Sequence, residues 1–140
     1  MNPVWVVDTN VLVSGLLNPR GSPGQIVDAF KAGRFTLAFD PLTLAEWHDV
    51  LHRPKFQFAA RDVAEFFAAV HLLGRYVFPP PVVPGVLGLP DSDDECFLDV
   101  ALLTPDRVLV TGNARHYPPR LRRGVTVLTP RQTVAKLKVR

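Results

Sequence analysis

Carboxylate side chains at three places in the chain could bind a divalent cation. Asp8 follows the apolar run 4–7, and Glu46 lies in an amphipathic segment. A third group places four acids within five residues: Asp91, Asp93, Asp94 and Glu95. A cation with oxygen ligands would relieve the mutual repulsion of these charges, and a carboxylate site without thiol or imidazole suits Mg²⁺ or Mn²⁺. Asn113, which follows a later apolar run, offers an amide oxygen as a further ligand.

Each of these acids also has a purely structural interpretation. Asp8 suits the N-cap of a helix that starts at Thr9. Glu46 lies at the margin of the apolar face of its helix, where an ordinary surface glutamate is also found. Asp94 in a first turn complements the helix dipole, and Ser92 with Glu95 has the form of a capping box. The residue types alone leave both interpretations open.

Apolar runs punctuated by Pro and Gly predict an alternation of strands and helices. Strands are expected at 4–7, 36–39, 107–111 and 125–128, with a short one at 82–83, and helices at 9–17, 25–32, 41–53, 61–74, 92–103 and 130–138. This order predicts an α/β fold in which a parallel sheet lies between two layers of helices. Because ligands bind at the carboxyl ends of the strands in such sheets, Asp8 and Asn113 are expected at one edge.

Length and composition fit a single domain over residues 1–140. Apolar residues make up 47% and charged residues 21%, which are globular proportions sufficient for one core. No apolar run is long enough for a transmembrane span, and the N-terminus lacks the pattern of a signal peptide. The lone Cys96 cannot form an internal disulfide, as is usual in a reducing compartment. We therefore expect a cytoplasmic protein with no membrane partner.

The charges are divided unevenly along the chain. Residues 1–106 hold seven Lys and Arg against thirteen Asp and Glu, whereas residues 107–140 hold nine basic residues and no acid. A basic face is the usual footprint of a polyanion partner, although a solvated basic tail would give the same count. The candidates for contact with phosphate are Arg115, Arg120, Arg122 and Arg123.

Other catalytic patterns find little support. His48 and His52 stand four residues apart on one helix, as in the zinc motif His-Glu-x-x-His, but an Asp replaces the Glu and no third ligand is evident. A solvated pair of imidazoles is the simpler account. The chain has no phosphate-binding loop, no Gly-x-Gly-x-x-Gly after a strand and no Gly-x-Ser-x-Gly elbow. Nucleotide-fuelled, dinucleotide-dependent and serine-hydrolase chemistry are therefore disfavoured.

Four segments in order resemble the PIN-domain ribonucleases, in particular the compact VapC-like toxins of bacterial toxin–antitoxin pairs. They are 6–14 with Asp8-Thr9-Asn10, then 44–46, 91–102 and 109–113. The resemblance covers nearly the whole chain and implies a strand order of 3-2-1-4-5. It also implies a Mg²⁺- or Mn²⁺-dependent endoribonuclease that hydrolyses single-stranded RNA. The implied partners are RNA, an antitoxin protein and a second copy of the chain.

The resemblance also implies roles for individual residues. Asp8, Glu46 and Asp94 match the characteristic acids of the family, while site-ordering roles fall to Thr9, Asn10 and Thr111. Asp8, Asp94 and Asn113 would hold the metal, with Glu46 and the Asp91/Asp93 loop supporting a second ion or the attacking water.

The chain departs from the family at Asn113, where Asp is usual. The lost charge should weaken metal binding. An alternative function is therefore a catalytically weak PIN domain that binds RNA or a partner without cutting. A structure-specific DNA nuclease is a more distant alternative.

Overall fold

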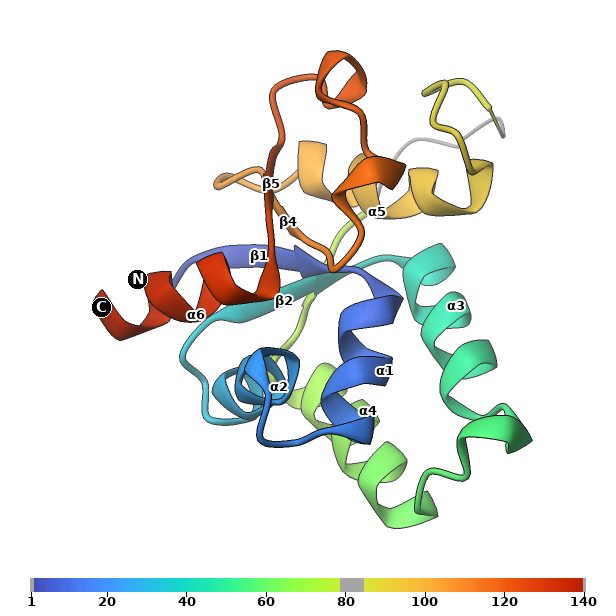
Figure 1. The fold of residues 1–140 in the computed structure, drawn as a ribbon, viewed down its shortest axis with the longest axis vertical. Helices are drawn as coiled ribbons and strands as arrows, with labels where there is room; N and C mark the ends of the chain where they lie inside the picture. Colours follow the sequence, from blue (N-terminus) through green and yellow to red (C-terminus); the bar gives the residue numbers. More distant parts are fainter. Residues whose placement is uncertain (1, 79–84, 140) are drawn as a thin grey trace.

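The computed structural model describes residues 2–78 and 85–139, which fold around a parallel sheet with helices on both sides (Figure 1). The strands are β1 (Val4–Val7), β2 (Thr36–Phe39), β3 (Arg75–Tyr76), β4 (Val108–Val110) and β5 (Thr126–Leu128). The helices are α1 (Thr9–Leu17), α2 (Ser22–Lys31), α3 (Pro41–Leu51), α4 (Ala60–Leu73), α5 (Glu95–Leu102) and α6 (Pro130–Val139). Short 3₁₀ turns are η1 (Pro54–Phe56), η2 (Ser92–Asp94), η3 (Ala114–His116) and η4 (Pro119–Leu121).

All strand pairs in the sheet are parallel, and the order is β3-β2-β1-β4-β5. This confirms the predicted α/β fold and strand order. The central pair is in register from Val6 opposite Leu109 to Val7 opposite Val110. Because both strands then end together, the residues after β1 and after β4 emerge side by side at the carboxyl edge.

The third strand differs from the prediction. The expected strand at 82–83 lies outside the described residues, and the strand beside β2 is the exposed pair Arg75–Tyr76. A two-residue edge strand is too short to show an alternating pattern, so nothing in the sequence marked it. Helix boundaries differ as well: α2 begins at Ser22, with a Pro in its first turn, α3 ends at Leu51, and α5 begins at Glu95 after the 3₁₀ turn η2.

Helix α3 begins where the sequence predicts, at a capping box. The Asp40 side chain accepts a hydrogen bond from the Thr43 N–H at 2.7 Å, and the Thr43 hydroxyl accepts one from the Asp40 N–H at 2.9 Å. Both residues are buried. The cap fixes the start of α3 at the carboxyl end of β2, and Glu46 lies one and a half turns further on.

The capping box expected from Ser92 and Glu95 does not form, and that prediction was wrong. Asp91 caps η2 instead, accepting from the Asp93 N–H at 2.9 Å. Glu95 is 1% exposed, and its carboxylate accepts the backbone N–H groups of Gly85, Leu87 and Leu89 at 3.0, 3.3 and 3.2 Å. These three donors satisfy a buried charge that a helix cap would have left near solvent.

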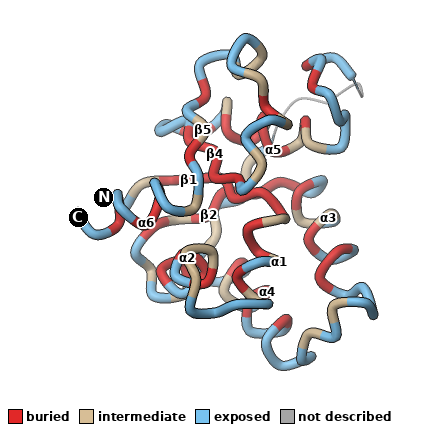
Figure 2. The backbone as a smooth tube through the Cα atoms, in the orientation of Figure 1, coloured by how far each residue is buried: buried red, intermediate tan, exposed pale blue. Residues whose placement is uncertain are grey.

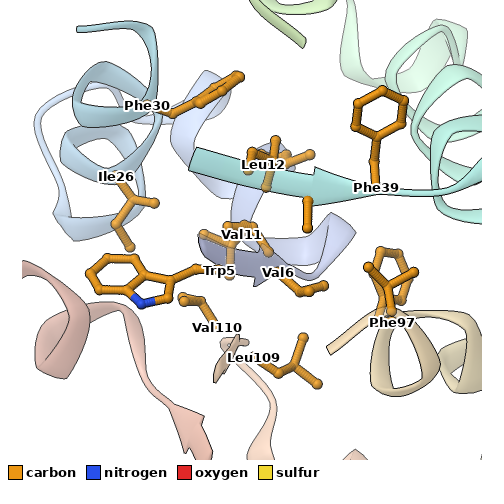
Figure 3. Close-up of a cluster of buried hydrophobic side chains, with 14 of the residues drawn as sticks. Trp5, Val6, Val11, Leu12, Ile26, Phe30, Phe39, Phe97, Leu109 and Val110 are labelled. Atoms are coloured by element: carbon orange, nitrogen blue, oxygen red, sulfur yellow. The ribbon is translucent and has the colours of Figure 1, made fainter. Parts of the chain in front are cut away.

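The core lies between the sheet and its helices, where buried residues are concentrated (Figure 2). Helix α5 lies on one side of the β1–β2 pair, and α1, α2 and α4 lie on the other (Figure 1). Figure 3 shows side chains of β1, β2, β4, α1, α2 and α5 meeting in this core. The four residues of β1 are all buried, as expected for a continuous apolar run covered on both faces. Within the described residues, no helix has the length and apolar character needed to cross a membrane.

Candidate active site

Asp8 lies at the carboxyl end of β1, directly beside the end of β4. Its N–H donates to the Val110 carbonyl at 2.9 Å, which continues the ladder between the two strands. Although Asp8 precedes α1, its side chain makes no capping hydrogen bond with that helix. The purely structural interpretation of Asp8 as a helix cap therefore loses its main support.

The Asp8 carboxylate is 3% exposed and receives three hydrogen bonds on one oxygen. Oδ2 accepts from the Asn10 amide at 3.1 Å, the Thr111 hydroxyl at 3.0 Å and the Tyr117 hydroxyl at 3.1 Å. Burial raises the pKa of Asp8, and the bonds from Thr111 and Tyr117 oppose this rise. Three donors on Oδ2 thus hold the Asp8 carboxylate in a fixed orientation.

Asn10 and Thr111, both predicted to order the site, lie next to Asp8 and bond to the turn after β4. The Asn10 Oδ1 accepts from the Gly112 N–H at 3.0 Å, and the Thr111 hydroxyl accepts from the Asn113 N–H at 3.1 Å. Thr9 behaves differently, since its hydroxyl is buried with no hydrogen-bond partner among the described residues. The structure thus brings two of the three predicted ordering residues onto Asp8.

Asp94 comes to the same edge from η2 and contacts a histidine that the sequence did not single out. Its Oδ2 lies 2.9 Å from the His116 Nδ1. Burial, together with the negative charge of Asp8, raises the pKa of Asp94 to about 6, and His116 opposes this rise. The two carboxylates are therefore close enough for the charge on Asp8 to disfavour ionisation of Asp94.

Asn113 reaches the same imidazole from the other side. Its Nδ2 lies 2.9 Å from the His116 Nε2. When Nδ1 carries the ring proton, the amide of Asn113 donates to Nε2, and Nδ1 faces the Asp94 Oδ2. His116 therefore contacts both Asn113, where the family usually has Asp, and the partly buried Asp94.

Glu46 and Cys96 belong to the same electrostatic environment. Burial raises the pKa of Glu46, and the charges of Asp93 and Asp8 contribute in the same direction. Burial also raises the pKa of the Cys96 thiol, as do the surrounding acids, in decreasing order Asp40, Glu46, Asp8 and Asp94. The half-buried Cys96 thus stands among four carboxylates, a position that no motif in the sequence indicated.

Asp91 and Asp93 lie at the rim of this site and are exposed. Asp91 already uses one oxygen to cap η2 through the Asp93 N–H. Their predicted part in metal binding stays a prediction.

The donor set fits a hard divalent cation held by few protein ligands. Among the residues that the structure describes, no three His, Cys, Asp or Glu side chains form a group able to hold a metal ion by themselves. Mg²⁺, however, is commonly bound by one or two carboxylates while it keeps several waters and takes substrate phosphates. Asp8 and Asp94, whose charges repel, provide such a pair of carboxylates.

The four candidate arginines lie in the segment between β4 and β5, which rises on the side of α5 (Figure 1). Arg115, Arg120 and Arg123 are exposed. Arg122 is partly buried, and its Nε donates to the Tyr117 carbonyl at 2.7 Å. The same segment carries His116 and Tyr117, which contact the two acids.

The two histidines of α3 do not form a zinc site. The His52 Nδ1 lies 2.7 Å from the His48 carbonyl, and the His48 ring stacks on Phe67 with 3.8 Å between ring centroids. Both histidines are exposed. This arrangement supports the simpler account, in which they are surface imidazoles packed against an aromatic ring.

Comparison with known families identifies the class of the protein. The family model described as the PIN domain matches residues 4–115, so the chain belongs to the PIN-domain family. PIN domains are generally nucleases. A comparison with curated proteins gives no match. The family match ends just before His116 and Tyr117, so the residues that contact Asp94 and Asp8 from the basic segment lie beyond it.

Proposed function

We propose that this protein is a divalent-metal-dependent endoribonuclease that hydrolyses phosphodiester bonds of single-stranded RNA. The observation that supports this most directly is the placement of two acids, Asp8 and Asp94, at the carboxyl edge of a parallel sheet beside a basic segment. Ligands bind at this edge in α/β sheets, and a polyanion would approach it along the arginines. Membership of a nuclease family accords with this chemistry.

Each residue of the site has a definite task in this proposal. Asp8 and Asp94 would hold Mg²⁺ or Mn²⁺, with Asn113 as a neutral oxygen ligand. When bound, such an ion supplies a water of lowered pKa and neutralises phosphate charge. Glu46 would orient the attacking water, and the arginines would bind backbone phosphates. Cleavage in line with the leaving oxygen would give a 5′-phosphate.

A cleavage assay tests this function directly. A fluorescently labelled single-stranded RNA is incubated with wild type and with Asp8→Asn, in Mn²⁺ and in chelator. We expect cutting only by wild type with Mn²⁺, and a product that carries a 5′-phosphate. Equal cutting in chelator, or by Asp8→Asn, would contradict the proposal. His48→Ala is the matched control for a zinc hydrolase and should cut like wild type.

A second candidate is a PIN domain that binds RNA without cutting it. The specific observation in its favour is that His116 contacts both Asp94 and Asn113, two of the three expected metal ligands. In this case RNA binding persists in chelator, and no Mn²⁺ concentration produces cleavage. The same assay, with a binding measurement alongside, separates the two functions.

The resemblance to VapC-like toxins extends the proposal to a biological setting. We infer a cytoplasmic toxin that is paired with an antitoxin protein and that associates as a homodimer. Growth arrest on expression of wild type, but not of Asp8→Asn, is the expected result. Sedimentation of the purified protein measures the oligomeric state.

A further inference from the structure

Tyr117 is the one donor to Asp8 that comes from the basic segment. It is 0% exposed, and its hydroxyl donates to the Asp8 Oδ2 at 3.1 Å. The other two donors, Asn10 and Thr111, lie within the family match, whereas Tyr117 follows its end at residue 115. Family membership therefore assigns Tyr117 no role.

The backbone around Tyr117 holds its ring in place. Its N–H donates to the Ala114 carbonyl at 3.0 Å, and its carbonyl accepts from the Arg122 Nε at 2.7 Å. Pro118 and Pro119 follow at once and restrict the chain. A phenol with its ordinary pKa of about 10 keeps its proton at neutral pH, so the Tyr117 hydroxyl is available as a donor to Asp8.

We propose that Tyr117 is a positioning residue that fixes Asp8 for cation binding and links it to the RNA-binding segment. Three donors on Oδ2 leave the other oxygen, Oδ1, as the one through which Asp8 binds the ion. Without the Tyr117 hydroxyl, Oδ2 keeps two donors, Asn10 and Thr111, and the carboxylate is held less firmly, so it is less often in the binding orientation. This inference rests on the proposed function and deepens it.

Tyr117→Phe tests the proposal because it removes the hydroxyl and keeps the ring that fills the core. Mn²⁺ affinity is measured without RNA, by calorimetry or electron paramagnetic resonance. We expect about tenfold weaker binding, the low end of the loss found when an outer partner of a metal ligand is removed. Tyr76→Phe, at the only other tyrosine of the chain, is the matched control and should bind Mn²⁺ like wild type.

A double-mutant cycle separates positioning from a general structural effect. If Tyr117 acts through Asp8, Tyr117→Phe should not change the residual Mn²⁺ affinity of the Asp8→Asn protein. With Mn²⁺ at saturation, the KM for RNA should stay at the wild-type value. Circular dichroism identifies the temperature range in which all four proteins of the cycle are folded, and titrations are run there.

The outcomes are distinct. Unchanged Mn²⁺ affinity in Tyr117→Phe, or an equal loss in the Asp8→Asn background, overturns the positioning role and leaves the proposed nuclease function intact. If wild type itself binds no Mn²⁺, the proposed function fails, and the role of Tyr117 fails with it.

Discussion

Asp8 and Asp94 are both removed from bulk water, but the chain compensates them differently. Asp8 receives three hydrogen bonds on one oxygen, whereas the Asp94 carboxylate contacts the His116 imidazole at 2.9 Å. A carboxylate with fewer donors keeps more of its desolvation penalty. For this reason the pKa of Asp94 is raised to about 6, with the charge of Asp8 adding to the effect of burial.

The raised pKa predicts that Asp94→Asn stabilises the metal-free protein at neutral pH. The folded-state pKa of about 6 exceeds the ordinary 3.8, so the fold favours the protonated acid, and stability falls as pH rises between these values. Asparagine removes that loss. In chelator at pH 7.5 we expect a gain of about 1–2 kcal/mol in the free energy of unfolding, from about 1.4 kcal/mol per pKa unit with allowance for partial exposure.

Urea denaturation at several pH values between 4 and 7.5 measures this gain. The difference between Asp94→Asn and wild type should be small near pH 4 and complete above pH 7. Asp28→Asn, at an exposed position of α2, is the control and should show no such trend. A pH-independent difference would contradict the prediction.

A further prediction concerns position 113, where Asn113→Asp restores the carboxylate that the family usually has. Asn113→Asp adds a negative charge beside His116 and Asp94 and one more hard oxygen ligand. We expect a lower Mn²⁺ concentration for half-maximal cleavage and a faster rate. The cleavage assay over a series of Mn²⁺ concentrations measures both, with Asn18→Asp at an exposed position as control. A loss of activity would show that Asn113 lies outside the shell of the cation.

At the scale of elements, the start of α5 positions a site residue and also binds a neighbouring segment of the chain. η2 presents Asp94 to the site, while one residue later Glu95 turns into the interior and holds the segment 85–89. Leu87 and Leu89, whose N–H groups make two of these bonds, are both 7% exposed, and their side chains join the core. One short stretch thus positions a candidate metal ligand and fastens a neighbouring segment at the same time.

Glu95→Gln should therefore destabilise the fold although the side chain keeps its size. An amide presents an N–H₂ group to backbone N–H groups that need an acceptor, so at least one bond is lost and a donor is left buried. We expect a loss of about 1–3 kcal/mol in the free energy of unfolding. Urea denaturation measures it, and Glu65→Gln, at an exposed position of α4, should change stability by much less.

At the scale of the whole molecule, the fold brings part of the basic C-terminal region into contact with acids from the first two thirds of the chain. The segment that follows β4 carries exposed arginines and also reaches the two acids through His116 and Tyr117. The segment that contacts the acidic site thus also carries arginines that would attract RNA in the proposed function. Phosphate contacts of this kind give affinity and position the strand without selecting its sequence.

The salt dependence of RNA binding tests this arrangement. Arg122 is spared because it also bonds to Tyr117, and the variant is Arg120→Ala with Arg123→Ala. Its slope of log affinity against log salt should fall by about 1.4, from about 0.7 per contact for a single strand. Lys136→Ala with Lys138→Ala, two exposed cations of α6, is the matched control. If both double variants show the same slope of log affinity against log salt, the arginines do not contact RNA phosphates and are ordinary solvated surface residues.

The sequence by itself determined the alternation of strands and helices and the positions of Asp8 and Asn113 at strand ends. These features follow from local patterns, because apolar runs, Pro and Gly determine the conformation of the chain within a few residues. The resemblance of four such segments added the family and the strand order. Asn10 and Thr111 could be anticipated as well, because they belong to the same motifs.

Only the tertiary structure decided which other side chains reach the acids. The Tyr117 hydroxyl bonds to a residue 109 positions away, and His116 pairs with Asp94 from beyond β4. A lone tyrosine or histidine has no neighbours in sequence that reveal such a partner. The inward turn of Glu95 was likewise hidden, because a glutamate after Ser-Asp-Asp satisfies a local capping pattern equally well. Contacts of this kind depend on how distant segments pack, and burial favours packing that gives a buried polar group a partner.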